Sequence, residues 1–108
     1  MASVRKPLGQ ATPNATTEAD LYTVPGATDA VISSFVVCNR GAATTFRMSI
    51  SVAGAATANK DYIYYDLTIA ANDTFVVSAG FTMAATDKMR VYAGTTNLSF
   101  SLFGQENS

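Results

Sequence analysis

The sequence lacks histidine, has one cysteine and contains no long apolar run. Without histidine, Ser-His-Asp and Cys-His nucleophilic sites and every metal site with an imidazole ligand are excluded. Because Cys38 is the single cysteine, no internal disulfide can form. No apolar run approaches the roughly 18 residues that a membrane-spanning helix needs. The first residues, "MASVRKPLGQ", contain no apolar segment, so we expect no secretory signal, synthesis in the cytoplasm and no membrane partner.

Charge is also scarce. Only 14% of the residues are charged, and the formal net charge is -1 at pH 7. Such a chain shows no electrostatic footprint for nucleic acid or anionic lipid, so we expect no nucleic-acid partner. The abundance of Ser, Thr and Ala predicts an uncharged surface, which suits a protein that is surrounded by other protein. A length of 108 residues predicts one domain that buries about 65% of the surface of its unfolded chain.

Apolar and polar residues alternate through much of the chain, and no segment shows a sustained helical stripe. Every second residue of "FRMSISV" (46–52) and of "LSFSL" (98–102) is apolar, which is typical of strands with one buried face. The mostly apolar segment "AVISSFVVCNR" (30–40) suits a central strand. With turn signals between the segments, the pattern predicts an all-β, antiparallel β-sandwich of about seven strands, Ig-like or jelly-roll-like. The expected strands are 20–24, 30–40, 44–53, 60–68, 74–81, 88–94 and 97–104.

The same alternation predicts which side chains face the interior. The residues expected to point inward are Phe46, Met48, Ile50, Phe75, Val77, Val91, Phe100 and Leu102. Cys38 lies in the middle of an apolar strand, and we therefore expect a buried structural thiol, because a reactive cysteine needs an accessible, electropositive setting.

A short sequence motif, which we call the repeated corner, occurs three times, as "GATDAV", "AANDTF" and "AATDKM". Asp and Asn side chains stabilise turns by bonding to nearby backbone, so we expect Asp29, Asp73 and Asp87 to be turn residues just before strands. A calcium site built from these three aspartates is not expected, because no ligand-dense loop of the D-x-D-x-D kind is present. The apolar residues that follow each aspartate by two positions, and that should enter the core, are Val31, Phe75 and Met89.

The first 18 residues differ from the rest of the chain. They contain Pro7 and Pro13 and show no sustained periodicity, which disfavours a regular helix or a central strand. We expect residues 1–18 to form an extended N-terminal arm and residues 19–108 to form the sandwich domain. A frayed tail is the alternative. The side chains of the arm that suit docking onto another protein are two apolar anchors and two cations, Val4, Leu8, Arg5 and Lys6.

The segment "KDYIYYDL" gathers three tyrosines beside two carboxylates. Strand alternation predicts Tyr62 and Tyr64 on one face and Tyr65 on the other. Tyrosine is enriched in interfaces, where one end of the side chain is apolar and the other wet, so a core or subunit-interface role is expected before a ligand-binding role. A glycosidase would need Asp61 or Asp66 in an apolar pocket as a proton donor, and a small β domain offers no obvious deep cleft.

The order of these signals resembles a group of small virion proteins of tailed bacteriophages. The resemblance runs from about Leu21 to Glu106, although Gly26-Ala27 stands where the order Ala-Gly is expected after the proline. The recurring pieces are turn and core signals, not catalytic motifs. They are Tyr22-Thr23-Val24-Pro25, Val37-Cys38-Asn39, Ala71-Asn72-Asp73-Thr74 and the strand from Asp87 to Ala93.

The resemblance implies a virion structural protein, a capsid decoration or cement protein that bridges major capsid protein subunits. A homotrimer on the capsid surface is favoured, with synthesis in the host cytoplasm and the N-terminal arm as a strut along a neighbour. The alternative is a tail- or fibre-associated module that recognises a virion partner or host glycan through its loops or tyrosines. An enzyme is not expected, and neither is a catalytic, cofactor or metal site. The predicted partner-binding residues are Val4, Arg5, Lys6, Leu8, Tyr62, Tyr64 and Tyr65.

Overall fold

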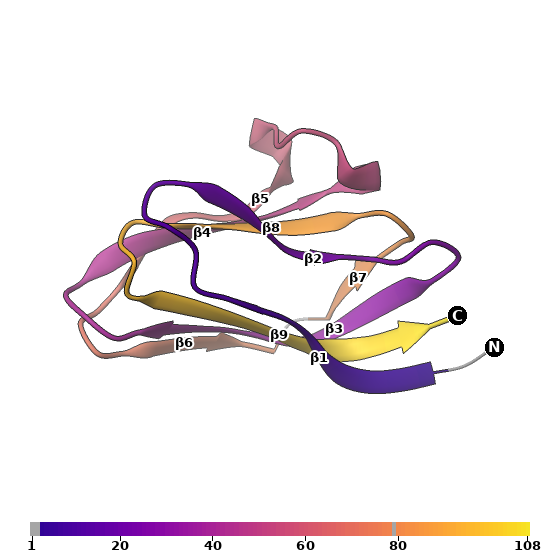
Figure 1. The fold of residues 1–108 in the computed structure, drawn as a ribbon, viewed down its shortest axis with the longest axis horizontal. Coiled ribbons are helices and arrows are strands. Elements are labelled where there is room, and N and C mark those ends of the chain that lie inside the picture. The colour runs from indigo at the N-terminus through magenta and orange to yellow at the C-terminus, as the bar shows by residue number, and fades with distance from the viewer. Residues whose placement is uncertain (1–2, 79) are drawn as a thin grey trace.

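The computed structural model describes residues 3–78 and 80–108. Nine strands in these ranges form two antiparallel sheets that pack face to face (Figure 1). The predicted all-β antiparallel sandwich is therefore confirmed, with nine strands in place of about seven. No helix among the described residues is long and apolar enough to cross a membrane.

The larger sheet has five strands, and β9 and β3 form its centre. The spatial order is β1-β9-β3-β6, and β7 pairs with β3 beyond the end of β6. The bounds are β1 (Ser3–Ala11), β3 (Asp29–Asn39), β6 (Thr74–Val77), β7 (Phe81–Met83) and β9 (Leu98–Asn107).

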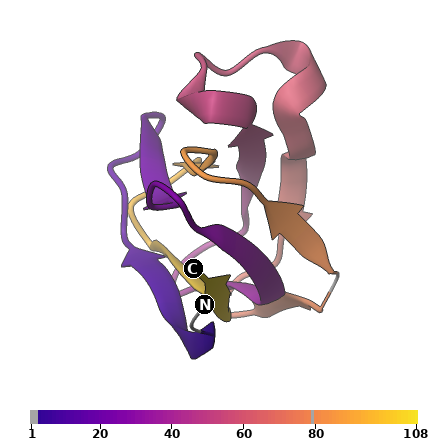
Figure 2. The same ribbon diagram turned by 90° about the vertical axis from the view of Figure 1, so that its right-hand side faces the viewer.

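The smaller sheet has four strands in the order β2-β8-β4-β5. Two single-turn 3-10 segments between β4 and β5, η1 (Val52–Gly54) and η2 (Asn59–Asp61), project from this sheet on the side away from the larger one (Figures 1 and 2). The strands are β2 (Glu18–Thr23), β4 (Thr44–Ser51), β5 (Tyr62–Ile69) and β8 (Lys88–Ala93).

The two additional strands come from two places in the chain. The predicted strand 74–81 is divided into β6 and β7, which pair with different parts of β3. Within that predicted strand, Ala79 lies outside the described residues. The other additional strand, β1, belongs to the segment that was expected to be an arm.

The extended segment at the N-terminus is part of the sandwich, which corrects the expectation of an arm apart from the sheet. Its residues pair with β9 from Ser3 opposite Asn107 to Ala11 opposite Phe100. Pro7 excludes a central strand but is tolerated on an edge strand, where the register also shifts by a bulge. Met1 and Ala2 lie outside the described residues.

A glycine lets β1 approach the other sheet. A Cβ atom built on Gly9 would lie 2.2 Å from the carbonyl oxygen of Leu21 in β2, which is closer than real Cβ atoms come. Any other residue at position 9 would therefore push β1 away from β2, so the glycine is what closes this side of the sandwich.

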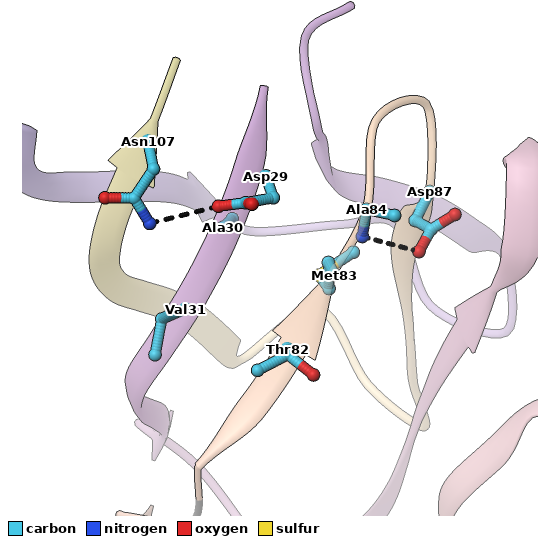
Figure 3. Close-up of a pocket in the computed structure, with 8 residues that line it drawn as sticks. All are labelled: Asp29, Ala30, Val31, Thr82, Met83, Ala84, Asp87 and Asn107. Carbon is cyan, nitrogen blue, oxygen red and sulfur yellow. Dashed lines mark hydrogen bonds between the residues drawn. The ribbon is translucent and has the colours of Figure 1, made fainter. Parts of the chain in front are cut away.

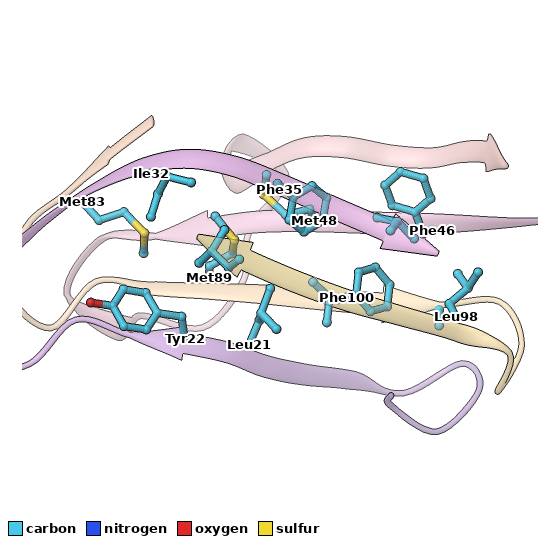
Figure 4. Packing of buried hydrophobic residues seen from close by; sticks show 14 of the residues in the cluster. Leu21, Tyr22, Ile32, Phe35, Phe46, Met48, Met83, Met89, Leu98 and Phe100 are labelled. Atoms are coloured by element: carbon cyan, nitrogen blue, oxygen red, sulfur yellow. The ribbon is translucent and has the colours of Figure 1, made fainter. Parts of the chain in front are cut away.

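The core lies between the sheets and is centred on aromatic rings (Figure 4). The ring of Phe35 lies 6.1 Å from that of Phe100 and 6.4 Å from that of Phe46, within the range in which aromatic pairs attract each other. All eight residues that were expected to face inward contribute to this core. Those that are buried are Phe46, Met48, Val91, Phe100 and Leu102, and those that are half-buried are Ile50, Phe75 and Val77.

Two of the three repeated corners are turns of the expected kind. Asp73 Oδ1 accepts a hydrogen bond from the N–H of Thr74, and Asp87 Oδ2 accepts one from the N–H of Ala84. Asp29 differs, because its carboxylate accepts a hydrogen bond from the side chain of Asn107.

The first corner differs because its turn, at Gly26 and Ala27, lies one residue further from the aspartate than in the other two. Asp29 is therefore already the first residue of β3. Phe75 and Met89 contribute to the core as expected, whereas Val31 is 41% exposed on the outer face of the larger sheet, which corrects its assignment to the core.

Candidate functional site

The four predicted contact residues of the N-terminal segment all lie on β1, but their surroundings differ. Val4 is 48% exposed, and Arg5 is exposed beside it. Lys6 Nζ lies 3.0 Å from Oε1 of Glu106, and Leu8 packs against the core. Val4 and Arg5 are therefore accessible to a partner, whereas Lys6 and Leu8 already make contacts within the chain.

Lys6 belongs to a polar network that joins the two sheets. The phenol of Tyr22 in β2 donates a hydrogen bond to Oε2 of Glu106 in β9, and Lys6 in β1 pairs with the other carboxylate oxygen. The hydrogen bond from Tyr22, and then that from Lys6, lowers the pKa of Glu106. Burial, and then the hydrogen bond to Glu106, raises the pKa of Tyr22.

The three tyrosines of β5 do not form one site. Tyr64 lies in the core, with its ring stacked 6.3 Å from that of Phe35. Tyr62 and Tyr65 lie outside it, with their ring centroids 4.8 Å apart and their planes at 77°. Tyr64 and Tyr65 therefore point to opposite sides, as predicted, whereas the prediction that Tyr62 shares a face with Tyr64 was wrong.

Irregular pairing between β5 and β4 causes this rearrangement. The register places Met48 opposite Tyr64 but Ser49 opposite Tyr62, so that one residue of β5 is extra, and a second shift follows at Tyr65 and Asp66. Asp66 has a positive φ of 50°. Each extra residue reverses the alternation of the side chains, which strict period-two reasoning does not anticipate.

Arg47 holds the ring of Tyr65 in place. Its guanidinium carbon lies 4.2 Å from the ring centroid of Tyr65 and 4.3 Å from that of Tyr92, so the cation contacts both rings. Arg47 Nε donates a hydrogen bond of 2.7 Å to Asp66 Oδ1, and this bond raises the pKa of Arg47. The alternation in "FRMSISV" places Arg47 on the outer face, but nothing in the sequence indicated its aromatic neighbours.

The two outer tyrosines border a hollow beside η2. It has a volume of about 360 Å³, and its lining residues are Asn59, Tyr62 and Tyr65. Tyr65 is 58% exposed, and Tyr62 is half-buried. We call Tyr62 and Tyr65 the aromatic corner.

Arg90 attaches the loop between β4 and β5 to the outer face of the smaller sheet. Its guanidinium donates hydrogen bonds to the carbonyl oxygens of Gly54 and Ala55 and to the hydroxyl oxygens of Ser51 and Thr57. Because three groups of the β4–β5 connection and the last residue of β4 converge on one side chain, this loop has a defined position above the sheet.

A carboxylate fixes the second half of the loop. Asp61 is buried, and its Oδ2 accepts hydrogen bonds from the N–H of Ala58 and the hydroxyl of Ser51. Lys60 Nζ lies 2.9 Å from its Oδ1. The backbone hydrogen bond from Ala58, followed by the hydrogen bond from Lys60, lowers the pKa of Asp61.

The thiol of Cys38 is half-buried, which corrects the expectation of a fully buried one. The register pairs Cys38 with Thr74 and Ser99, on the outer face of the larger sheet, because the inward positions of β3 at this end are Val37 and Asn39. The apolar run suggested burial of Cys38, whereas β3 buries only its inward-facing residues, which alternate on either side of a bulge between Ile32 and Ser34.

Another hollow, of about 490 Å³, lies at one end of the sandwich between β3, β7 and β9 (Figure 3). The two carboxylates and the amide among its lining residues are already engaged. Asn107 donates to Asp29, and Asp87 accepts from the backbone of Ala84 and Ala53. Within residues 3–78 and 80–108, no three histidine, cysteine, aspartate or glutamate side chains are clustered so that they could hold a metal ion.

The fold is similar to that of a protein from a solved structure of Bacillus endospore appendages, which are described as a family of disulfide-linked pili. The match has a TM-score of 0.55 and 17% sequence identity, and it covers 96% of this chain and 84% of the other. At this identity the likeness establishes a shared fold. No protein-family model matches the sequence. No curated protein matches it either.

Proposed function

We propose that the protein is a structural subunit that assembles with neighbouring protein subunits, and that its work is mechanical, not catalytic. The observation that carries the proposal is the edge strand β1. Residues 3–7 are all exposed, and β1 is the outermost strand of its sheet, so within the described residues its outer hydrogen-bonding edge has no strand partner. Such an edge accepts a strand from another chain.

The outer face of the larger sheet supports the same proposal. Val76 is 58% exposed and Val31 is 41% exposed, and Val36 and Phe103 are half-buried on the same face. Removing apolar surface of this kind from water in a subunit contact contributes about 25 cal/mol per Å², which offsets part of the entropic cost of association. The similarity of the fold to an appendage protein is consistent with a building block of an extracellular assembly.

The specific form of the proposal places the chain on the capsid of a tailed bacteriophage. There it bridges major capsid protein subunits as a decoration protein, as a homotrimer, and β1 supplies the contact that was expected of the arm. This form of the proposal rests on the resemblance of the segment from Leu21 to Glu106 to small virion proteins of tailed bacteriophages. A subunit of the tail or its fibres is the alternative, and the two forms differ in where the protein is found.

The assembly proposal is tested by the mass of the purified chain in solution, measured by light scattering over a range of concentrations. We expect an oligomer, and we expect Val4→Lys to weaken it because a charge on an edge strand opposes pairing. Ala71→Lys, which introduces the same charge in an exposed turn, is the matched control. A chain that is monomeric at every concentration contradicts self-assembly.

The capsid proposal is tested by sedimentation of the labelled protein with phage heads from which the tails have been removed. Binding to heads and not to separated tails is the expected result. Binding to tails alone overturns the decoration role and supports the alternative.

A further inference from the structure

We propose that the aromatic corner is a binding site for a neutral hexopyranose unit of a glycan. Such a site is additional to the assembly role, because it lies on the smaller sheet whereas β1 is the edge of the larger one. The proposal rests on the fixed position of the two rings, on the polar groups around the hollow and on its size.

Tyr65 presents an exposed ring that is held rigidly before any ligand binds. Arg47 contacts the ring, and is itself held by Asp66 through hydrogen bonds of 2.7 and 3.4 Å and by its contact with the ring of Tyr92. A pre-organised ring loses little conformational freedom when a ligand stacks on it, and this reduces the cost of binding.

The second wall of the corner is also fixed. Asp61, which is buried and bonded to the backbone of Ala58, lies directly before Tyr62 in the chain. This anchor places Asn59 and Tyr62 on the same hollow as Tyr65, although Asn59 belongs to η2 and the tyrosines to β5. Two rings at 77° and an amide therefore surround one small space.

The chemistry of the lining favours a neutral polyol. The polar groups around the hollow are two phenol hydroxyls and one carboxamide, and each of these can both donate and accept hydrogen bonds, as sugar hydroxyls do. None of the lining residues carries a charge that would select an ionic ligand. The nearby ammonium of Lys60 is paired with Asp61 and does not line the hollow. The C–H face of a pyranose matches the face of an aromatic ring, and the hydroxyls at its rim match these polar groups.

The size of the hollow favours a single sugar ring over a peptide. Its volume of about 360 Å³ lies near the lower end of the range of small-molecule sites, which is about 300–1,000 Å³. A stable protein contact would need a patch of about 800 Å² on each partner, and the hollow is lined by only a few side chains.

The test is saturation-transfer difference NMR with the full chain and a panel of methyl hexopyranosides, including the gluco, galacto, manno and N-acetylglucosamine forms. We expect at least one of them to receive magnetisation, strongest at the C–H protons of one ring face. Tyr65→Ala should reduce the affinity about tenfold, because an aromatic contact of this kind contributes on that order. Tyr65→Phe, which keeps the ring, should retain most of it.

Controls separate loss of the site from loss of the fold. Tyr65 is mostly exposed, so Tyr65→Ala should keep the circular dichroism of the unaltered chain, and Asn59→Ala should reduce binding without changing the melting temperature. Val76→Ala, on the larger sheet, should leave binding unchanged. The proposal is overturned if no pyranoside of the panel binds, or if Tyr65→Ala binds a pyranoside as well as the unaltered chain does. It is also overturned if a proline-rich peptide binds at the aromatic corner and no pyranoside does.

Discussion

The hydroxyl of Tyr22 donates a hydrogen bond across the sandwich to the carboxylate of Glu106, and so connects a strand of the smaller sheet to a strand of the larger. The two residues are 84 positions apart in the chain. Lys6 pairs with the same carboxylate, so one acidic side chain joins β1, β2 and β9. This contact lies beside the edge of β1 that we propose for assembly. Removing the contact is therefore the most direct test of how β1 is held in the sandwich.

Replacing Tyr22 with phenylalanine should lower the free energy of unfolding by about 1.5–3 kcal/mol, the usual contribution of a hydrogen bond to a charged group. The ring stays in the core, so the loss reports the hydroxyl alone. Urea denaturation measures the change. Tyr92→Phe is the matched control, because the contact of Tyr92 with Arg47 is through its ring, and it should change stability by much less.

Stability should fall in acid because three carboxyl groups have lowered pKa values in the folded chain. Hydrogen bonds from Tyr22 and Lys6 lower that of Glu106, a hydrogen bond from Lys88 lowers that of Asp20, and the backbone of Ala58 lowers that of Asp61. The folded chain holds protons more weakly than the unfolded chain, so this stabilisation is complete above the ordinary carboxyl pKa of about 4 and is lost as the pH falls through the lowered values.

Denaturation at a series of pH values measures this dependence. Glu106→Gln should flatten the acid limb of the curve, because it removes one of the three groups. The pH dependence of Asp73→Asn is the comparison. Asp73 lies in a turn near the end of β3 that is opposite to Asp29. If Glu106→Gln leaves the slope between about pH 5 and 2 unchanged, the carboxylate does not titrate as the network requires.

Deleting residues 1–11 should destabilise the domain strongly. The deletion uncovers the edge of β9 along its whole pairing with β1 and removes Leu8 and Ala11 from the core. An extended arm apart from the sheet, as the sequence predicted for residues 1–18, would instead be lost with a shift in melting temperature of only a few degrees. Circular dichroism melting distinguishes the two expectations, with Arg5→Ser as a variant that keeps the strand intact.

Truncation of Phe100 to alanine should cost about 3–5 kcal/mol of unfolding free energy, because the ring is fully buried against Phe35 and Phe46. Val76→Ala on the exposed outer face should change it by less than about 0.5 kcal/mol. Chemical denaturation of both variants gives the comparison. Similar values for the two would mean that the last strand does not have the register described.

The alternation of apolar residues along the chain was sufficient to predict the fold class and most of the core. When one face of a strand is buried, an apolar period of two leaves only one set of side chains that can point inward. Phe46, Met48 and Phe100 were therefore correctly placed inside. Asp73 and Asp87 were recognised because a turn aspartate bonds within a few residues of itself, and such local bonds leave a local sequence signal.

Contacts between distant segments set the features that the alternation did not predict. Pro7 argued against a strand, yet pairing with β9 and the close passage at Gly9 make residues 3–11 a strand of the sandwich. The bulges of β5 arise from its pairing with β4, and they moved Tyr64 into the core and brought Tyr62 to Tyr65. Register across a sheet is set jointly by both strands, so neither strand's sequence reveals it, and the aromatic corner exists only once the sheet has formed.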